Sequence, residues 1–297
     1  MWPGSPFILA ALSPPTIFFR ASPRSNQHAA APPGRGPAKG VRLNSTNFWP
    51  ASIQGAVSLT FDDGCQSQLD NAIPCLDDAG LRGTFYVNPG RSPGWERNLE
   101  GWRLACIKGH EIGNHTTEHP CSCNYGFRPD GYCLENLTFA DMEETIDAAT
   151  AELDRLFPEQ RGRRTFSYPC YQTYVGAGEN RRSYVPLVAR RFKAARGRGE
   201  RPNDPAVIDL SYTWSYVMEG SMCEEVIDYI EGAMERGQWA IVCMHGVGAD
   251  HISTEMEAFR RMVLHLDRNR DRIWTGTMLS VAEYVLARRS GLAAGNH

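Results

Sequence analysis

The sequence predicts an α/β barrel built on a parallel sheet, preceded by an irregular segment. From Gly55 onward, short apolar, β-branched runs alternate with stretches at helical spacing, which is typical of α/β folds rather than all-β folds or helical bundles. The first three elements follow in the order strand, helix, strand, and this order implies parallel pairing through a right-handed crossover. At 297 residues the chain is long enough to bury the core of one large domain.

Residues 1–45 are expected to be disordered or processed, and residues 46–290 to form the folded domain. No Asp or Glu precedes Asp62, and the first 37 residues contain eight prolines. Proline at this density sustains neither a helix nor a central strand. An export signal is one interpretation, although Pro14-Pro15 interrupts the apolar run and no basic residue precedes it. A disordered tail, or a start codon placed too far upstream, is the other.

The composition excludes two classes of protein. A formal net charge of −3 leaves no field of Lys and Arg for a general nucleic-acid binder. The chain contains no apolar run of about 18 residues, so no membrane-spanning helix is predicted. The nine cysteines do not form the dense, even framework of a small secreted scaffold. Cys121, Cys123 and Cys133 are close enough for a disulfide or a metal, without the C-x2-C spacing of zinc sites.

The elements can be justified in order along the chain. Residues 56–61 are an apolar, β-branched run, the pattern of a buried strand, which ends at Asp62. The segment up to Ala79-Gly80 has the pattern of a helix that closes on glycine, and residues 83–87 form the second strand.

The later elements continue this alternation. Thr138 and Asp141 have the spacing of a helix N-cap and its N3 partner, ahead of a helix through Leu156. Further strands are expected at residues 166–169, 206–210, 238–244 and 273–277, and further helices begin at Ser221, Thr254 and Ser280. Residues 190–205 are crowded with charge, Gly and Pro, which predicts a solvated surface loop.

Two adjacent carboxylates, Asp62 and Asp63, follow the first predicted strand. The carboxyl ends of strands are where a parallel barrel builds its active site. Carboxylates at the end of a buried strand are costly to desolvate unless a cation or partner absorbs their charge. Successive side chains of an extended backbone point in different directions, so the two can hold separate roles. The alternative is an Asp-Asp-Gly turn on the surface.

Histidines follow two further apolar segments. His115 and His119 are four residues apart, so on a helical turn both imidazoles lie on one face and can bind one metal. His245 comes directly after the apolar residues 239–244, and a core histidine satisfied by hydrogen bonds is the competing interpretation. One Asp with two His suits Zn²⁺, Co²⁺, Ni²⁺ or Fe²⁺. A second carboxylate and a distant His complete the equipment of metal-assisted hydrolysis.

With these motifs the sequence resembles the polysaccharide deacetylase family, the NodB-homology type of carbohydrate esterase family 4. The resemblance spans about residues 51–286. T-F-D-D-G at residues 60–64 matches the family's first motif, and H-T-x-x-H at residues 115–119 matches the second. The resemblance implies a distorted (β/α) barrel with fewer strands than the eightfold version, and a deacetylase-like catalytic domain over residues 46–290.

The resemblance also implies the roles of the site residues. Asp62 would be the catalytic base and His245 the general acid, while Asp63, His115 and His119 would hold a divalent metal, zinc in preference to cobalt, nickel or iron. Water activated at the metal and deprotonated by Asp62 would attack an acetyl group of an acetylated carbohydrate, and His245 would protonate the departing amine or alkoxide. The family also favours an extracytoplasmic location. The oligomeric state is not predicted.

The third motif departs from the family pattern. R-x-P-Y is replaced by S-Y-P-C at residues 167–170, so the Arg that steadies the catalytic Asp is missing. Without a nearby cation the pKa of Asp62 should rise. The candidates to replace that cation are Arg163, Arg164, Arg181 and Arg182. Cys170 keeps the main-chain N–H that serves as the family's oxyanion donor.

The fourth motif, an Asp-Trp pair, is also blurred. Asp209 and Trp214 are the nearest candidates, Asp209 to orient His245 and Trp214 to line the acetyl pocket, with core packing as the alternative for Trp214. Tyr168 and Cys170 complete the predicted substrate-binding set. Two tryptophans, Trp95 and Trp102, are expected either to stack on sugars or to pack in the core.

Two other functions stay open. The altered third and fourth motifs are compatible with a carbohydrate-binding pseudoenzyme that keeps the fold and has lost turnover. A hydrolase of a non-acetyl amide is the other alternative, because one fold hosts many chemistries.

Overall fold

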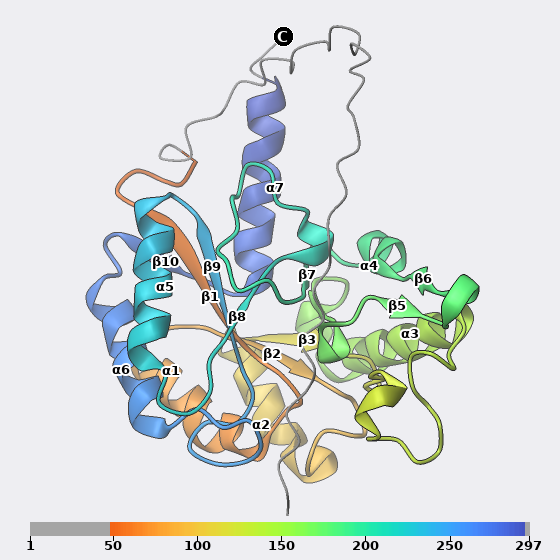
Figure 1. The fold of residues 1–297 in the computed structure, drawn as a ribbon. Helices are drawn as coiled ribbons and strands as arrows, with labels where there is room; N and C mark the ends of the chain where they lie inside the picture. The colour runs from red at the N-terminus through yellow and green to blue at the C-terminus, as the bar shows by residue number, and fades with distance from the viewer. Residues whose placement is uncertain (1–47, 295–297) are drawn as a thin grey trace, which may run out of the picture. The chain divides into compact units, whose positions relative to one another are not determined.

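A parallel sheet forms the centre of the computed structural model, which describes residues 48–294 (Figure 1). Its strands run in the order β7-β4-β3-β2-β1-β9-β8, with β10 paired to β1 beside this path. All of these pairings are parallel. The strands are β1 (Gly55–Phe61), β2 (Thr84–Val87), β3 (Glu111–Asn114), β4 (Phe166–Ser167), β7 (Ala195–Arg196), β8 (Tyr216–Val217), β9 (Trp239–Met244) and β10 (Ile273–Thr275). A separate antiparallel pair consists of β5 (Tyr174–Val175) and β6 (Arg182–Ser183).

Strand β1 lies in the middle of the sheet, and each of its residues is buried. One edge pairs with β9 from Ala56 to Phe61, and the other pairs first with β10 and then with β2. Strand β9 is buried along its whole length as well. Apolar runs without polar alternation are expected for strands covered on both faces. The strands predicted at residues 56–61 and 238–244 are therefore confirmed.

The sheet curls until its two ends meet. Thr213, just ahead of β8, pairs in parallel with Arg196 of β7. The Thr213 N–H donates to the Ala195 carbonyl at 2.8 Å, and the Thr213 carbonyl accepts from the Gly197 N–H at 2.8 Å. The predicted distorted (β/α) barrel is confirmed, with seven strands along its path.

The helices cover the outside of this barrel. Helices α2 and α3 pack against β3, α5 packs against β1 and β9, and α7 packs against β1. Figure 1 shows α5 and α6 beside β9 and β10, with α3 and α4 at the other end of the sheet. Within residues 48–294 the α-helices are α1 (Ile73–Asp78), α2 (Trp95–Ile107), α3 (Phe139–Leu156), α4 (Val185–Arg191), α5 (Cys223–Glu235), α6 (Met256–Arg268) and α7 (Met278–Ala294).

Helix α3 follows its local sequence signals closely. The Thr138 hydroxyl accepts a hydrogen bond from the Asp141 N–H at 3.2 Å, and the Asp141 carboxylate accepts one from the Thr138 N–H at 2.7 Å. This reciprocal pair is a capping box, and it satisfies backbone donors that the first turn leaves without partners. Met142, Ile146 and Leu153 form the buried stripe of the helix. The predicted cap and stripe are both confirmed.

Two predictions about the chain after α4 are wrong. Residues 206–210 form no strand, because the Val207 and Ile208 N–H groups both turn back to the Asp204 carbonyl. Residues 190–205 are more than a solvated loop, since they contain β7 and the fully buried Arg196. A strand of two residues is too short to show a hydrophobic period in the sequence. It becomes recognisable as a strand only through its pairing with β4.

The two tryptophans of α2 lie in the core. Trp95 is 4% exposed and Trp102 is 0% exposed, so neither can stack on a sugar. The disordered or processed segment predicted for residues 1–45 lies outside the described residues. Among residues 48–294, the structure contains no helix whose length and apolar character would let it cross a bilayer.

Candidate active site

Asp62 and Asp63 lie at the carboxyl end of β1, where the chain turns away from the sheet. The Asp62 N–H donates to the Met244 carbonyl at 2.9 Å, which extends the pairing with β9 by one step. Asp63 and Gly64 then adopt positive φ angles of 72° and 63°. A Cβ atom on Gly64 would lie 2.5 Å from the Ser92 hydroxyl, so the turn requires glycine. Asp62 is only 3% exposed, which rules out a surface turn.

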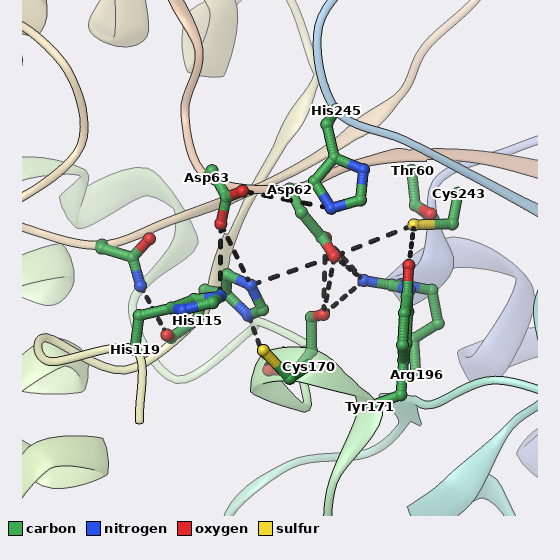
Figure 2. Close-up of polar contacts among 12 residues, drawn as sticks. Thr60, Asp62, Asp63, His115, His119, Cys170, Tyr171, Arg196, Cys243 and His245 are labelled. Atoms are coloured by element: carbon green, nitrogen blue, oxygen red, sulfur yellow. Dashed lines mark hydrogen bonds and ion pairs between the residues drawn. The ribbon is translucent and has the colours of Figure 1, made fainter. Parts of the chain in front are cut away.

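Asp63 lies beside the two predicted histidine ligands (Figure 2). Its Oδ1 is 3.6 Å from His115 Nε2 and 3.3 Å from His119 Nε2. These three residues form a group whose ligand atoms all lie within 4.8 Å of one another. A tetrahedral metal with bonds of about 2.0–2.2 Å separates its ligand atoms by about 3.3–3.6 Å. The donor set and its spacing therefore fit a divalent metal.

The two histidines reach this point from a loop and not from a helical turn. His115 follows β3 directly, and both Thr116 and His119 have positive φ angles, 64° and 47°. The His119 N–H donates to the Thr116 hydroxyl at 2.9 Å, which holds the loop in this form. The predicted helical geometry is wrong, although the predicted convergence of the imidazoles is present. His115 Nδ1 lies 2.8 Å from the Ser167 carbonyl, which leaves Nε2 directed at the cluster.

Two disulfides surround the His119 loop. Cys121 is bonded to Cys170, and Cys123 to Cys133. The sequence predicted a disulfide or a metal among Cys121, Cys123 and Cys133, and the bond with Cys170 was not foreseen. Two other groups of potential ligands, one with His119 and one with Glu135, contain these oxidised cysteines and so offer no thiolate.

The cation that steadies Asp62 is Arg196. Its Nη2 lies 2.5 Å from Asp62 Oδ1, and it also contacts Oδ2 and the Ser167 hydroxyl. Arg196 and Ser167 are direct partners in the pairing of β7 with β4. The guanidinium thus reaches Asp62 from the strand next to the one that carries it in the family pattern.

The four arginines considered from the sequence lie elsewhere. Arg164 is buried and donates to the carbonyls of Leu153 and Phe157. Arg163 pairs with Glu283, and Arg181 lies over the Tyr174 ring. Arg182 is exposed on β6. The prediction that one of these four replaces the missing cation is therefore wrong.

Arg196 also reverses the expected effect on Asp62. Burial alone would raise the pKa of the Asp62 carboxyl, but the charge of Arg196, with smaller contributions from His115 and His245, holds this pKa below its ordinary value. Asp62 is therefore ionised at neutral pH.

His245 follows β9 and borders the cluster. Its Nε2 is 4.0 Å from Asp63 Oδ2, and burial lowers the pKa of the imidazole, against the opposing charges of Asp62 and Asp63. Its Nδ1 is buried and has no hydrogen-bond partner within residues 48–294. Asp209 was predicted to orient this ring. Instead, Asp209 is exposed and accepts a hydrogen bond from the Ser211 N–H at 2.9 Å, so that prediction is wrong.

The predicted substrate-binding residues divide into two groups. Cys170 lines the same cavity as the proposed metal ligands Asp63, His115 and His119, and its φ angle is positive, at 49°. Tyr168 is fully buried in the core, where its hydroxyl donates to the Ser211 carbonyl at 2.7 Å. Trp214 lines a separate cavity together with Val207. The structure does not bring Tyr168 and Trp214 to the cluster.

His251 is a site residue that the sequence analysis missed. Its Nε2 lies 2.7 Å from Asp63 Oδ2, the carboxylate oxygen farther from the two predicted ligands. This hydrogen bond raises the pKa of His251. The available signal was its position six residues after His245, in the loop that follows the same strand.

A cavity of about 660 Å³ gives access to these groups. Asp62, Asp63, His115, His119 and His245 all line it. All five predicted catalytic and metal-binding side chains therefore meet at one opening, at the carboxyl ends of β1, β3 and β9.

Comparison with known proteins agrees with this geometry. The family model for polysaccharide deacetylases matches residues 51–175, which include Asp62, Asp63, His115 and His119. Residues 51–175 are therefore similar to polysaccharide deacetylases. The two predicted motifs, at residues 60–64 and 115–119, lie within the matched range.

The chain matches only a part of each of two longer relatives. A chitin disaccharide deacetylase from Vibrio alginolyticus is 30% identical over 102 residues, 32% of this chain and 24% of that protein. A gellan lyase from a Bacillus species is 23% identical over 303 residues, 88% of this chain and 11% of that protein. The chain spans about a quarter or less of the length of these relatives.

Crystal structures with the same fold come from two bacteria. A protein from Mycobacterium smegmatis, described as a polysaccharide deacetylase, aligns with a TM-score of 0.58 at 16% identity, covering 81% of this chain and 93% of that one. One from Pseudomonas aeruginosa PAO1, described in the same way, aligns with a TM-score of 0.57 at 13% identity, covering 81% and 93%. At this identity the likeness shows the deacetylase barrel.

Proposed function

We propose that this protein is a metal-dependent hydrolase that removes acetyl groups, N- or O-linked, from a carbohydrate polymer or oligosaccharide. The observation that carries the proposal is the division of labour between two adjacent carboxylates. Asp63 converges with His115 and His119 at ligand spacing, while Asp62 forms an ion pair with Arg196. Metal-assisted hydrolysis needs this pair of roles, one carboxylate for the metal and one for a proton.

Asp62 acts as the general base. Its carboxylate is held by Arg196, and its Oδ2 lies 3.9 Å from Nε2 of the proposed ligand His115. A lowered pKa keeps it ionised and ready to accept the water's proton at neutral pH. A divalent metal bound by Asp63, His115 and His119, with zinc expected before cobalt, nickel or iron, supplies Lewis acidity for the water and the acetyl carbonyl.

His245 protonates the leaving amine or alkoxide. Its imidazole borders the cluster, with Nε2 4.0 Å from Asp63 Oδ2, and lines the same cavity as Asp62. The main-chain N–H of Cys170, at the rim of the same cavity, is proposed as a donor to the oxyanion. Asp62 thus accepts one proton from the water and His245 donates one to the leaving group, and loss of a proton from Asp62 with uptake of one by His245 restores both groups for the next turnover.

The substrate class rests on the relatives. A chitin disaccharide deacetylase that is 30% identical over 102 residues supports an acetylated glycan as substrate. The altered third and fourth motifs suggested a pseudoenzyme. Arg196 supplies the cation missing from the third motif, which favours the hydrolase, while within residues 48–294 the fourth motif has no counterpart at the cluster. A non-acetyl amide substrate remains an outcome of the test below.

The test is acetate release from a panel of N- and O-acetylated oligosaccharides, after metal stripping and reloading with Zn²⁺ or Co²⁺. We expect release only after reloading. Two neighbouring variants separate the roles: Asp62→Asn should keep the metal and lose about 10²–10⁴-fold in rate, as for loss of a general base. Asp63→Asn should lose the metal itself, measured by elemental analysis.

Each contrary outcome has a definite meaning. Metal-loaded protein that releases no acetate from any glycan, and behaves like Asp62→Asn, contradicts the proposal. Release of formate or ammonia from small formamides and imides, without acetate from glycans, would identify the amide hydrolase instead.

A further inference from the structure

Two exposed aromatic side chains, Tyr125 and Phe127, border the candidate active site. Both line the cavity that contains the metal cluster. Their rings stack with centroids 5.0 Å apart and planes inclined by 12°, yet Tyr125 remains 53% exposed and Phe127 65% exposed. Large apolar groups left in contact with water beside a polar cavity indicate a surface that binds something.

The loop that carries this pair is held firmly. The Cys123–Cys133 disulfide closes it, and the Cys121–Cys170 disulfide ties its start to the other rim of the cavity. The Glu135 carboxylate accepts from the Cys123 N–H at 2.7 Å and from the Ser122 hydroxyl at 2.6 Å. A binding surface that is ordered before the ligand arrives loses little entropy when it binds.

Phe127 also marks the junction of two cavities. A second cavity of about 500 Å³ shares Asp63, His119 and Phe127 with the first. Asp63 and His119 therefore lie where the two cavities meet, and Phe127 lies at the same junction, with Tyr125 beside it in the first cavity. A ligand longer than one sugar ring has room to extend past the reacting group.

We propose that the Tyr125–Phe127 pair is the platform on which a pyranose ring of the substrate packs, next to the ring that carries the acetyl group. The proposal rests on the proposed function. The axial C–H groups of a pyranose form an apolar, weakly positive face, which is complementary to the electron-rich face of an aromatic ring. The chain thus selects substrates of at least two sugar units.

The test measures binding without turnover, in the Asp62→Asn background. N-acetylated chitooligosaccharides of one to four units are titrated by calorimetry into this protein and into its Tyr125→Ala, Phe127→Ala and doubly substituted forms. We expect affinity for the tetramer to fall by about tenfold per ring removed, which is on the order of 1.4 kcal/mol each. Tyr125→Phe, which keeps the ring, should restore the binding lost in Tyr125→Ala.

A matched control is Ile107→Ala on α2. The exposed fraction of Ile107, 68%, is similar to that of Phe127, and Ile107 lines neither cavity. Near-ultraviolet circular dichroism and a count of free thiols establish that each variant keeps its fold and both disulfides. The dependence on length is the second readout, since the ratio of tetramer to monomer affinity should fall in the alanine variants.

Two results would overturn the platform. One is equal tetramer affinity in the doubly substituted form and the Ile107→Ala control, and the other is no tetramer binding by any form. The proposed function fails separately, when the protein with Asp62 intact and metal bound releases no acetate from these sugars or from a small acetyl ester.

Discussion

Arg196 and Ser167 face each other across β7 and β4, and together they hold the carboxylate of Asp62. The family's arginine position is occupied here by serine, and the cation comes from the neighbouring strand. The Arg196 guanidinium also donates a hydrogen bond to the Ser167 hydroxyl, so side chains at positions 167 and 196 can both reach the Asp62 carboxylate.

This pairing predicts the result of an exchange. Arg196→Ser should lower kcat/KM for acetate release by about a hundredfold or more, since it leaves the buried Asp62 without its cation. The double variant Ser167→Arg with Arg196→Ser should recover to within about tenfold of the unaltered chain, because the arginine returns to the same carboxylate from β4. Rates with confirmed metal content are the measurement. A double variant no better than Arg196→Ser would contradict the exchange.

His251 is not a predicted metal ligand, but it should increase the affinity of the proposed site for the metal. It holds Asp63 Oδ2 at 2.7 Å, so its loss frees the carboxylate to rotate. His251→Ala is expected to weaken Zn²⁺ binding by about tenfold to a hundredfold, and His251→Gln, which can still donate, by less. Competition with a chromogenic chelator measures the affinity directly. Equal affinity in all three proteins would show that the hydrogen bond has no such role.

The Cys121–Cys170 disulfide should contribute strongly to stability. It closes a loop with a sequence separation of 49, for which chain entropy predicts about 4 kcal/mol. The Cys121→Ser, Cys170→Ser double variant should lose about this much free energy of unfolding in urea. Replacing Cys123 and Cys133, which are separated by 10, should cost less, about 2.7 kcal/mol. The opposite order would mean that native contacts, and not loop length, set the effect.

His110 should make stability depend on pH. It is fully buried, its Nδ1 accepts from the Gly83 N–H at 3.1 Å, and its Nε2 lies 3.2 Å from Asp77. Burial lowers the pKa of His110 to about 4, below the ordinary value of 6.5. The unfolded chain therefore binds more protons between these values, and the free energy of unfolding falls as pH drops from 6.5 towards 4.

Urea unfolding at a series of pH values measures this slope. The His110→Gln variant, which cannot titrate, should lose the part of the slope between pH 4 and 6.5 and keep the rest. An unchanged slope in His110→Gln would assign the pH dependence to other groups.

The parts of the fold that follow from sequence are those with long local signals. β1, β9 and α3 could be predicted because a buried strand is a continuous apolar run and a capped helix has a fixed spacing of cap and stripe. The convergence of Asp63 with His115 and of both with His245 also follows, since parallel strands bring their carboxyl ends to one edge.

The parts that were missed depend on contacts between distant segments. Arg196 acquires its role from strand register, and β7 is too short to show any period. The spacing of His115 and His119 suits a helix, but positive φ angles in the loop between them achieve the same convergence differently. Disulfide connectivity cannot be deduced from cysteine spacing, so the bond to Cys170 was not accessible.

Because Cys121 lies two residues after His119 and Cys170 three residues after Ser167, one covalent bond joins the segments that carry a metal ligand and the partner of Asp62. If a metal binds Asp63, His115 and His119 as proposed, its affinity and the stability of the Cys121–Cys170 disulfide should depend on each other. Glutathione keeps exposed thiols reduced in a reducing cytosol, so formation of this disulfide requires an oxidant. Recombinant material made in a reducing cytosol should bind zinc more weakly until it is reoxidised.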